Sequence, residues 1–222
     1  VGPRCLTLSG SLGFSGVRGF QIFVLRSALA LIASIALSAC DSKRLPVLGP
    51  DDTILAFGDS LTHGTGVSQG DSYPTVLATL TNRSVVNAGV PGEISATGLS
   101  RLPAVLKEIR PSLMVLLHGG NDVLRNLDLS QTRNHLSAMI TLAKDQGVEV
   151  VLVGVPQKSL FSDSAPIYSE LAQQHGLVFL DDIIANLVRS PSKKSDSVHF
   201  NADGYRELAQ AIYDRLKKAG AI

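Results

Sequence analysis

Cysteine is almost absent from this sequence. The 222-residue chain contains only two cysteines, Cys5 and Cys40, and both fall within its first 40 residues. Residues 41–222 therefore have no thiol, which excludes disulfides, cysteine nucleophiles and cysteine-ligated metals from that part of the chain. A domain without cysteine also suits an oxidising compartment outside the cytoplasm.

The chain also lacks an excess of charge of either sign. Its 20 Lys and Arg residues nearly balance its 19 Asp and Glu residues, which gives a formal net charge of +1. The basic residues are scattered rather than gathered in a stripe, so no strong field would steer nucleic acid to the protein. We therefore expect no nucleic-acid partner.

No apolar run reaches the roughly 20 residues that span a bilayer core. The run SALALIASIALSAC at 27–40 follows a stretch with three arginines and no acidic residue. A basic start, a short apolar stretch and a small-residue exit are typical of a cleaved signal peptide. We expect residues 1–40 to be this peptide, residues 41–50 to be a linker, and residues 51–222 to be one domain.

The exit sequence LSAC at 37–40 resembles the lipobox of bacterial lipoproteins, whose cysteine becomes the lipidated first residue of the mature protein. Acyl chains on Cys40 would hold the domain on a membrane surface. This interpretation puts the protein in the cell envelope, on the periplasmic side. The alternative is a plain secretory peptide with a chance cysteine at its exit, which would give a soluble periplasmic or secreted protein.

From residue 53 onward, short apolar runs alternate with helical periods. The runs have the length and apolarity of strands buried on both faces, and they lie at 53–57, 84–88, 113–117, 148–153 and 177–180. Apolar residues at helical spacing occur at 99–109, 136–143, 167–172 and 205–216. This alternation predicts a three-layer α/β/α domain around a five-stranded parallel sheet.

Candidate catalytic residues lie where ligands gather in such a sheet, at the carboxyl ends of the strands. Ser60 comes just after the first expected strand. Asp196 and His199 precede the last helix, for which Asn201 is the expected cap. At this spacing the carboxylate can hold the imidazole, and the imidazole can take the proton that a serine hydroxyl must lose to become a nucleophile. We predict a triad of these three residues.

The negative charge that develops in acyl transfer needs preorganised hydrogen-bond donors. We assign this role to the backbone N–H groups of Ser60 and Gly89 and to the side-chain amide of Asn121. A glycine at position 89 would let the chain approach the substrate without a Cβ in the way. We expect Asp59 to brace the loop beside Ser60, through a hydrogen bond with Asn87.

Four sequence blocks carry a resemblance to a known family: FGDSLTHG, VVNAGVPGE, LLHGGNDVLR and DSVHFNADGY. In this order and spacing they resemble the SGNH (GDSL-type) hydrolases, close to the bacterial arylesterase, lysophospholipase and acyl-CoA thioesterase I group. The resemblance implies a flavodoxin-like sheet, no cofactor or metal, and hydrolysis of small acyl esters, thioesters or lysophospholipids through an acyl-serine. Two positions depart from the family's pattern: Glu93, where Asp is common, and Phe200, where many relatives carry proline.

Other functions compete with this one. Metal-dependent phosphoester hydrolysis would draw on ligand types near the strand ends, namely Asp59, His63, His118, Asn121 and Asp122. A two-metal site needs a denser set, and we expect His118 to be a packed, hydrogen-bonded residue at the end of a buried run. A carbohydrate O-deacetylase of the same family and a non-catalytic, membrane-tethered binding module also stay open.

Apolar residues in the loops that follow the strands could line an acyl groove or simply pack beneath the loops. These residues are Val123, Leu124, Leu127, Leu160 and Phe161.

Overall fold

The computed structural model describes residues 43–157 and 164–222. The expected signal peptide with Cys40 and two groove candidates, Leu160 and Phe161, lie outside the described residues. The described part forms one five-stranded, all-parallel sheet, as predicted, and its strand order is β2-β1-β3-β4-β5. The strands are β1 (Thr53–Gly58), β2 (Ser84–Gly89), β3 (Leu113–Leu117), β4 (Glu149–Val153) and β5 (Val178–Leu180).

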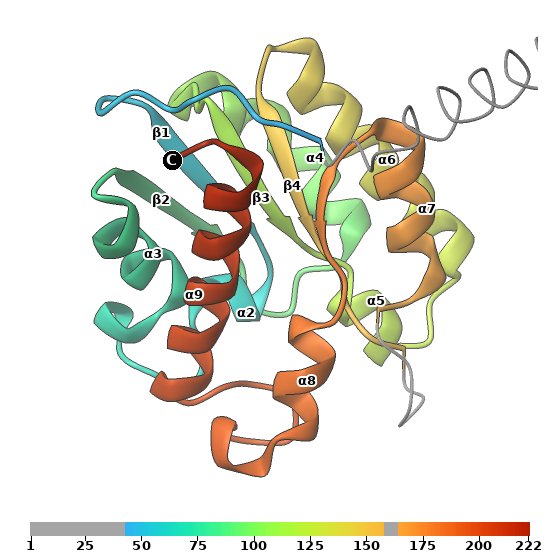
Figure 1. The fold of residues 1–222 in the computed structure, drawn as a ribbon. Coiled ribbons are helices and arrows are strands. Elements are labelled where there is room, and N and C mark those ends of the chain that lie inside the picture. Colours follow the sequence, from blue (N-terminus) through green and yellow to red (C-terminus); the bar gives the residue numbers. More distant parts are fainter. Residues whose placement is uncertain (1–42, 158–163) are drawn as a thin grey trace, which may run out of the picture. The chain divides into compact units, whose positions relative to one another are not determined.

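Helices cover both faces of this sheet, which gives the three layers that the sequence predicts (Figure 1). On one face α3 and α9 pack together, with α8 beside α9, and on the other face α6 lies between α4 and α7. The helices are α2 (Ser60–His63), α3 (Tyr73–Thr81), α4 (Ser95–Ile109), α5 (Gly120–Leu124), α6 (Leu129–Asp145), α7 (Pro166–His175), α8 (Ile183–Arg189) and α9 (Ala202–Ala219). Short 3-10 turns lie at Gln69–Asp71 and Pro191–Lys193.

The core sits in the middle of the sheet. Every residue of β3 is buried, and so is all of β1 after Thr53, because each of these strands has a neighbour on both sides and helices on both faces. β2 is different: it lies at the edge, pairs only with β1, and its residues are exposed or half-buried. The expectation of a strand buried on both faces is therefore wrong for β2.

The expected linker at 41–50 is also packed in part against the domain. Leu45 and Leu48 are buried, at 6% and 5% exposure. Their backbone N–H groups donate to the carbonyls of Ala219 (2.9 Å) and Ala221 (2.8 Å) at the end of α9. The segment follows the edge where the strands begin, so its attachment lies away from the ends of the strands where ligands are expected (Figure 1).

The order of the strands creates a point where two loops diverge. β1 and β3 are neighbours in the sheet, although β2 lies between them in the chain. The chain therefore leaves β1 toward one side of the sheet and β3 toward the other, which is the arrangement that forms ligand crevices in open α/β sheets. Ser60 follows β1 and Asn121 follows β3, so both lie at this point. Across residues 43–157 and 164–222, no helix has the length and apolarity to cross a membrane.

Candidate active site

Ser60 begins the short helix α2 directly after β1. Asp59 caps this helix, because its Oδ1 atom accepts a hydrogen bond from the Leu61 backbone N–H at 3.1 Å. Gly64 ends the helix in the left-handed conformation, at φ 91°. The capping task thus falls to Asp59, and the Ser60 side chain is left to face the solvent-accessible edge of the sheet.

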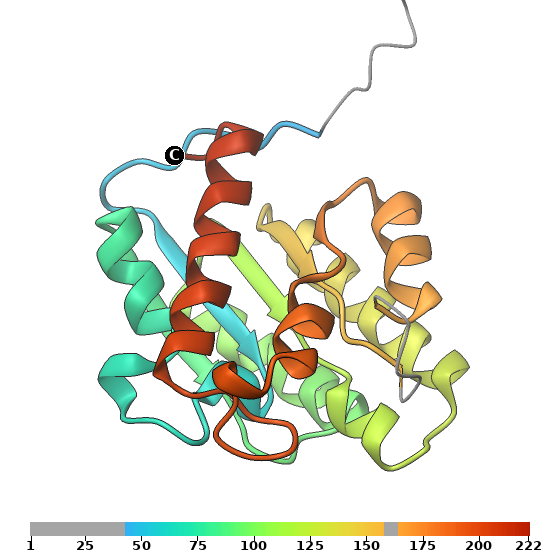
Figure 2. The ribbon, with the colours of Figure 1, turned by 60° about the horizontal axis from the view of Figure 1, so that its bottom comes forward.

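His199 meets Ser60 at this edge. Its Nε2 atom lies 2.9 Å from Ser60 Oγ. The histidine comes from the loop between α8 and α9, which Figure 2 shows beside the turn that follows β1. The loop is held in shape by a bond from Ser195 N–H to His199 O (3.0 Å) and by the cap of α9, where Asn201 Oδ1 accepts from Gly204 N–H as the sequence predicts.

Asp196 holds the other side of the imidazole. Its Oδ2 atom lies 2.7 Å from His199 Nδ1, and its Oδ1 atom accepts the backbone N–H groups of Val198 and His199, both at 2.8 Å. The bond to the His199 ring, followed by these two backbone bonds, lowers the pKa of Asp196 to about 2. An ionised carboxylate at Nδ1 fixes the tautomer in which Nε2 is free to accept the Ser60 proton. The structure thus brings the three predicted triad residues together.

Asn121 lies on α5, where its side-chain amide reaches across the crevice. Its Nδ2 atom donates to the backbone oxygen of Glu93 at 3.0 Å and, through a longer bond of 3.3 Å, to Asp59 Oδ2. Asn121 lines the same cavity as Ser60. Because the longer bond is the weaker one, the amide can exchange it for a bond to a substrate oxygen.

Gly89, in contrast, is not placed as a donor to the site. Its N–H donates to Asn87 Oδ1 at 3.0 Å, and it does not line the cavity that contains Ser60 and Asn121. A Cβ at this position would lie 2.1 Å from the backbone nitrogen of His63, so the glycine is needed for close packing of β2 against α2. The expected third donor is therefore corrected to a packing glycine.

Asp59 braces the loop as expected, but its partner differs from the one predicted. It bonds to Leu61 N–H and to Asn121, whereas Asn87 bonds to Gly89 N–H and to the carbonyl of His63. Asp59 is 3% exposed, and this burial raises its pKa. It connects the helix that carries the serine to the amide of Asn121.

A cavity of about 530 Å³ opens beside Ser60 and His199. Val123 and Leu124 line it, as the acyl-groove hypothesis expects, whereas Leu127 is not among its lining residues in the described part of the chain. Helix α8 also lines the cavity, through Ile184, Ala185 and Val188, and these residues were not predicted from the sequence. The helical spacing of these apolar residues in the sequence could have indicated that a helix lies there.

Two ligand types of the metal-hydrolase alternative, His118 and Asp122, are engaged in other contacts. His118 is fully buried, accepts the Gly119 N–H at its Nδ1 atom (2.8 Å), and places Nε2 at 3.1 Å from Glu93. Asp122 accepts bonds from the Ser95 N–H and hydroxyl. Among residues 43–157 and 164–222, no three His, Cys, Asp or Glu side chains are grouped to hold a metal ion. His118 is the packed, hydrogen-bonded histidine that the sequence predicts.

Comparison with known proteins agrees with this geometry. The sequence profile of the GDSL-like Lipase/Acylhydrolase family matches residues 56–207, which include both Ser60 and His199. The chain belongs to this family. Its fold, with a parallel sheet between two helix layers, is also that of SGNH hydrolases of known structure.

Individual relatives of this GDSL-family chain are hydrolases by name. Thioesterase 1/protease 1/lysophospholipase L1 of Escherichia coli strain K12 is 29% identical over 174 residues, which cover 75% of this chain and 84% of that protein. Arylesterase of Vibrio mimicus is 27% identical over 204 residues, or 86% and 97% of the two chains. The crystal structure of AlinE4, an SGNH-hydrolase family esterase, matches with a TM-score of 0.60 and 31% identity over 78% of this chain and 98% of that one.

Proposed function

We propose that this GDSL-family protein is a serine acylhydrolase that cleaves small carboxylic esters and thioesters, including lysophospholipids, through an acyl enzyme on Ser60. The observation that carries the proposal is the continuous hydrogen-bonded line from Ser60 Oγ through the His199 ring to Asp196, at 2.9 Å and 2.7 Å. The names of the relatives, which include thioesterase, lysophospholipase and arylesterase, support the substrate class.

In the first half of the reaction, Ser60 Oγ attacks the carbonyl carbon of the substrate and its proton passes to His199 Nε2. The imidazolium that forms is stabilised by the Asp196 carboxylate. The carbonyl oxygen gains a negative charge, and we assign the Ser60 N–H and the Asn121 amide as the donors that stabilise it. When the bond to the leaving oxygen or sulfur breaks, His199 gives the proton to the leaving group.

In the second half, water takes the place of the leaving group. His199 removes a proton from this water while the oxygen attacks the acyl carbon, and the same donors receive the charge again. The intermediate breaks down to a free carboxylic acid, and His199 returns the proton to Ser60 Oγ. The cycle needs no cofactor.

The cavity walls favour an acyl chain as the bound group. Apolar side chains of both α5 and α8 line the cavity: Val123 and Leu124 from α5, and Ile184 and Val188 from α8. Burying a methylene group between such walls contributes about 0.8 kcal/mol. The substrates should therefore include esters with acyl chains longer than acetyl.

We also propose that Cys40 is lipidated and that the protein is held on a membrane in the cell envelope. The support is the sequence pattern of residues 1–40, with its basic start, short apolar stretch and LSAC exit. Expression of the full chain with a labelled fatty acid tests this. Incorporation that is lost in Cys40→Ala is the expected result, and equal labelling of both proteins would contradict it.

The test of the catalytic proposal is hydrolysis of p-nitrophenyl esters from acetate to decanoate in the presence of EDTA. Ser60→Ala should lower kcat by at least about 10⁴-fold, while Ser100→Ala, on the exposed face of α4, should leave it unchanged. Loss of activity in EDTA would instead support the metal alternative. Activity confined to acetyl esters would favour a carbohydrate O-deacetylase, and no turnover at all would favour a binding module.

A further inference from the structure

The reaction described above makes no use of a buried carboxylate that lies next to the site. The Glu93 side chain is 2% exposed, yet it carries a charge. Arg101 pairs with it through two bonds, from Nε to Oε1 and from Nη2 to Oε2, both at 2.7 Å. Burying such an ion pair destabilises the fold unless the geometry of the pair is good. A buried ion pair beside the active site therefore suggests a functional role.

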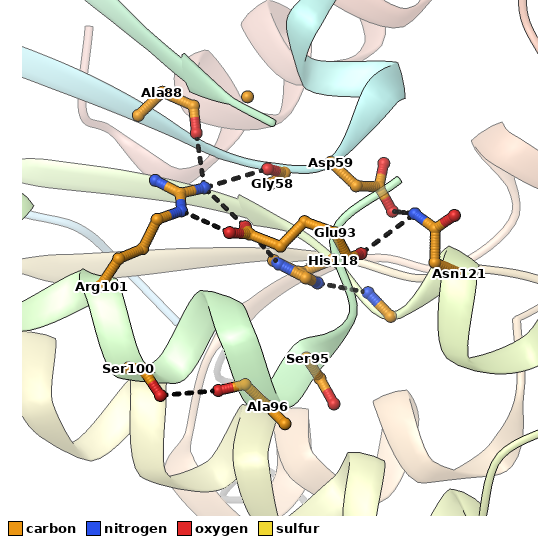
Figure 3. Close-up of polar contacts among 12 residues, drawn as sticks. Gly58, Asp59, Ala88, Glu93, Ser95, Ala96, Ser100, Arg101, His118 and Asn121 are labelled. Atoms are coloured by element: carbon orange, nitrogen blue, oxygen red, sulfur yellow. Dashed lines mark hydrogen bonds and ion pairs between the residues drawn. The ribbon is translucent and has the colours of Figure 1, made fainter. Parts of the chain in front are cut away.

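Arg101 also connects this carboxylate to the ends of two strands. Its Nη2 atom donates to the carbonyls of Ala88, at the end of β2 (2.8 Å), and Gly58, at the end of β1 (3.2 Å). The guanidinium lies 4.1 Å from the centre of the Phe57 ring, which adds a cation–π contact. Figure 3 shows Arg101 between these carbonyls and Glu93. The carboxylate is thereby fixed to the edge of the sheet from which Ser60 emerges.

His118 holds the same carboxylate from the third strand. Because the Gly119 N–H donates to Nδ1, the neutral ring carries its proton on Nε2, which donates to Glu93 Oε2 at 3.1 Å. A Cβ at Gly98 would lie 2.4 Å from His118 Nε2, so helix α4 leaves the ring no room to move. Glu93 is thus tied to the ends of β1, β2 and β3 together.

The backbone of Glu93 is the part that reaches the reaction. Its carbonyl oxygen accepts one N–H of the Asn121 side chain at 3.0 Å, as the dashed lines of Figure 3 show. The two N–H groups of an amide share one plane, so a fixed partner for one of them sets the direction of the other. In Asn121 the other N–H points toward Asp59 and the cavity.

We propose that Glu93, held by Arg101 and His118, is a positioning residue that aims the Asn121 amide at the oxygen that becomes negative during acyl transfer. This inference rests on the proposed function, because it assumes a charged intermediate on Ser60. Glu93 does not touch the substrate. Its contribution passes through its main-chain carbonyl to Asn121, and it should disappear when Asn121 has no amide to aim.

The test is a double-mutant cycle measured with one p-nitrophenyl ester. Asn121→Ala alone should lower kcat by about 10²- to 10³-fold. Glu93→Gln alone should lower kcat by about 10- to 100-fold with little change in KM, because it disturbs geometry rather than ground-state binding. In the Asn121→Ala background, Glu93→Gln should change kcat by less than about twofold. An equal loss in both backgrounds would overturn the inference and leave Glu93 a structural residue.

Two further variants keep the test decisive. Arg101→Lys keeps the positive charge but cannot form the two bonds to Glu93. It should therefore show the same pattern in the cycle as Glu93→Gln, and it takes the place of Glu93→Gln if that protein fails to fold. Glu149→Gln removes the partner of Lys43 at the start of β4 and should leave kcat unchanged in both backgrounds. Ser60→Ala separates the two hypotheses. Activity in Ser60→Ala would refute the proposed function. If Ser60→Ala is inactive but the losses from Glu93→Gln and Asn121→Ala are additive, only the role of Glu93 is refuted.

Discussion

His199 Nε2 and Ser60 Oγ lie 2.9 Å apart, although 139 residues separate them in the chain. The serine comes from the helix that follows β1, and the histidine comes from the loop before α9. Local chain geometry could not bring them together. The contact depends on the packing of α9 against α3 and the sheet, so the reactive pair forms only in the folded domain.

Replacement of Asp196 by Asn tests the carboxylate that holds His199. Asp196→Asn keeps the size of the side chain but offers an amide to Nδ1, which favours the wrong tautomer of the ring. We expect kcat to fall by about 10⁴-fold with little change in KM. Asp203→Asn is a matched control, because Asp203 also bonds to a basic side chain three residues along the chain, Arg206, but lies on the exposed start of α9. A decrease of less than tenfold in Asp196→Asn would contradict the triad.

Gly89→Ala tests the packing of β2 against α2. In Gly89→Ala the new Cβ would lie 2.1 Å from His63 N, so β2 and α2 must move apart. Overpacking of this kind costs about 1–3 kcal/mol, and we expect Tm to fall by about 2 to 10 °C in a thermal melt. Gly70→Ala is the control, since its Cβ would meet nothing closer than Ser68 Oγ at 3.7 Å. An unchanged Tm would contradict the packing role of Gly89.

The sequence predicts the sheet well because its signal is local. Near-continuous apolar runs mark the strands, and the bounds of β3 agree with the run at 113–117. The triad residues could be predicted from chemistry, since Ser60, Asp196 and His199 stand where parallel strands and a helix cap place polar side chains. The environment of β2 could not be predicted, because an edge strand differs from a central one only in its number of neighbours.

The hydrogen-bond partners within the site could not be predicted from the sequence, for another reason. Asn87 could bond to Asp59 or to the Gly89 N–H, and only the observed approach of β2 to α2 decides between them. The cavity wall from α8 was missed because the helix is short, from Ile183 to Arg189, and about two turns give little helical periodicity. Both cases depend on tertiary contacts between segments distant in the chain.

Glu93 should make stability depend on pH in a defined direction. Burial alone would raise its pKa, but the bonds from His118 and Arg101 outweigh this and lower it from 4.5 to about 2. A lowered pKa means that the stabilisation is present above about pH 4.5 and is lost as the pH falls toward 2. The free energy of unfolding, measured in urea, should therefore be lower for Glu93→Gln than for the unmodified protein at pH 7, and this difference should be smaller at pH 3.

The control for this measurement is Ser100→Ala, which changes no titratable group. Its difference from the unmodified protein should be the same at pH 7 and pH 3. If the difference in free energy of unfolding between the protein and Glu93→Gln instead grows as the pH falls, burial dominates the pKa of Glu93 and the side chain takes up a proton in the folded state.

The α8 wall of the cavity should set the longest acyl chain that the enzyme accepts. Val188 lines the cavity and is only partly buried, so Val188→Phe can place its larger ring in the open space rather than in the core. We expect kcat/KM for octanoate and decanoate esters to fall at least about tenfold while that for acetate stays within about twofold, because only long chains reach this wall. Val47→Phe makes the same change at a residue that is 78% exposed and outside the cavity lining, and should leave the whole series unchanged. If Val188→Phe lowers acetate and decanoate hydrolysis equally, the chain does not bind along α8 and the acyl group must lie elsewhere in the cavity.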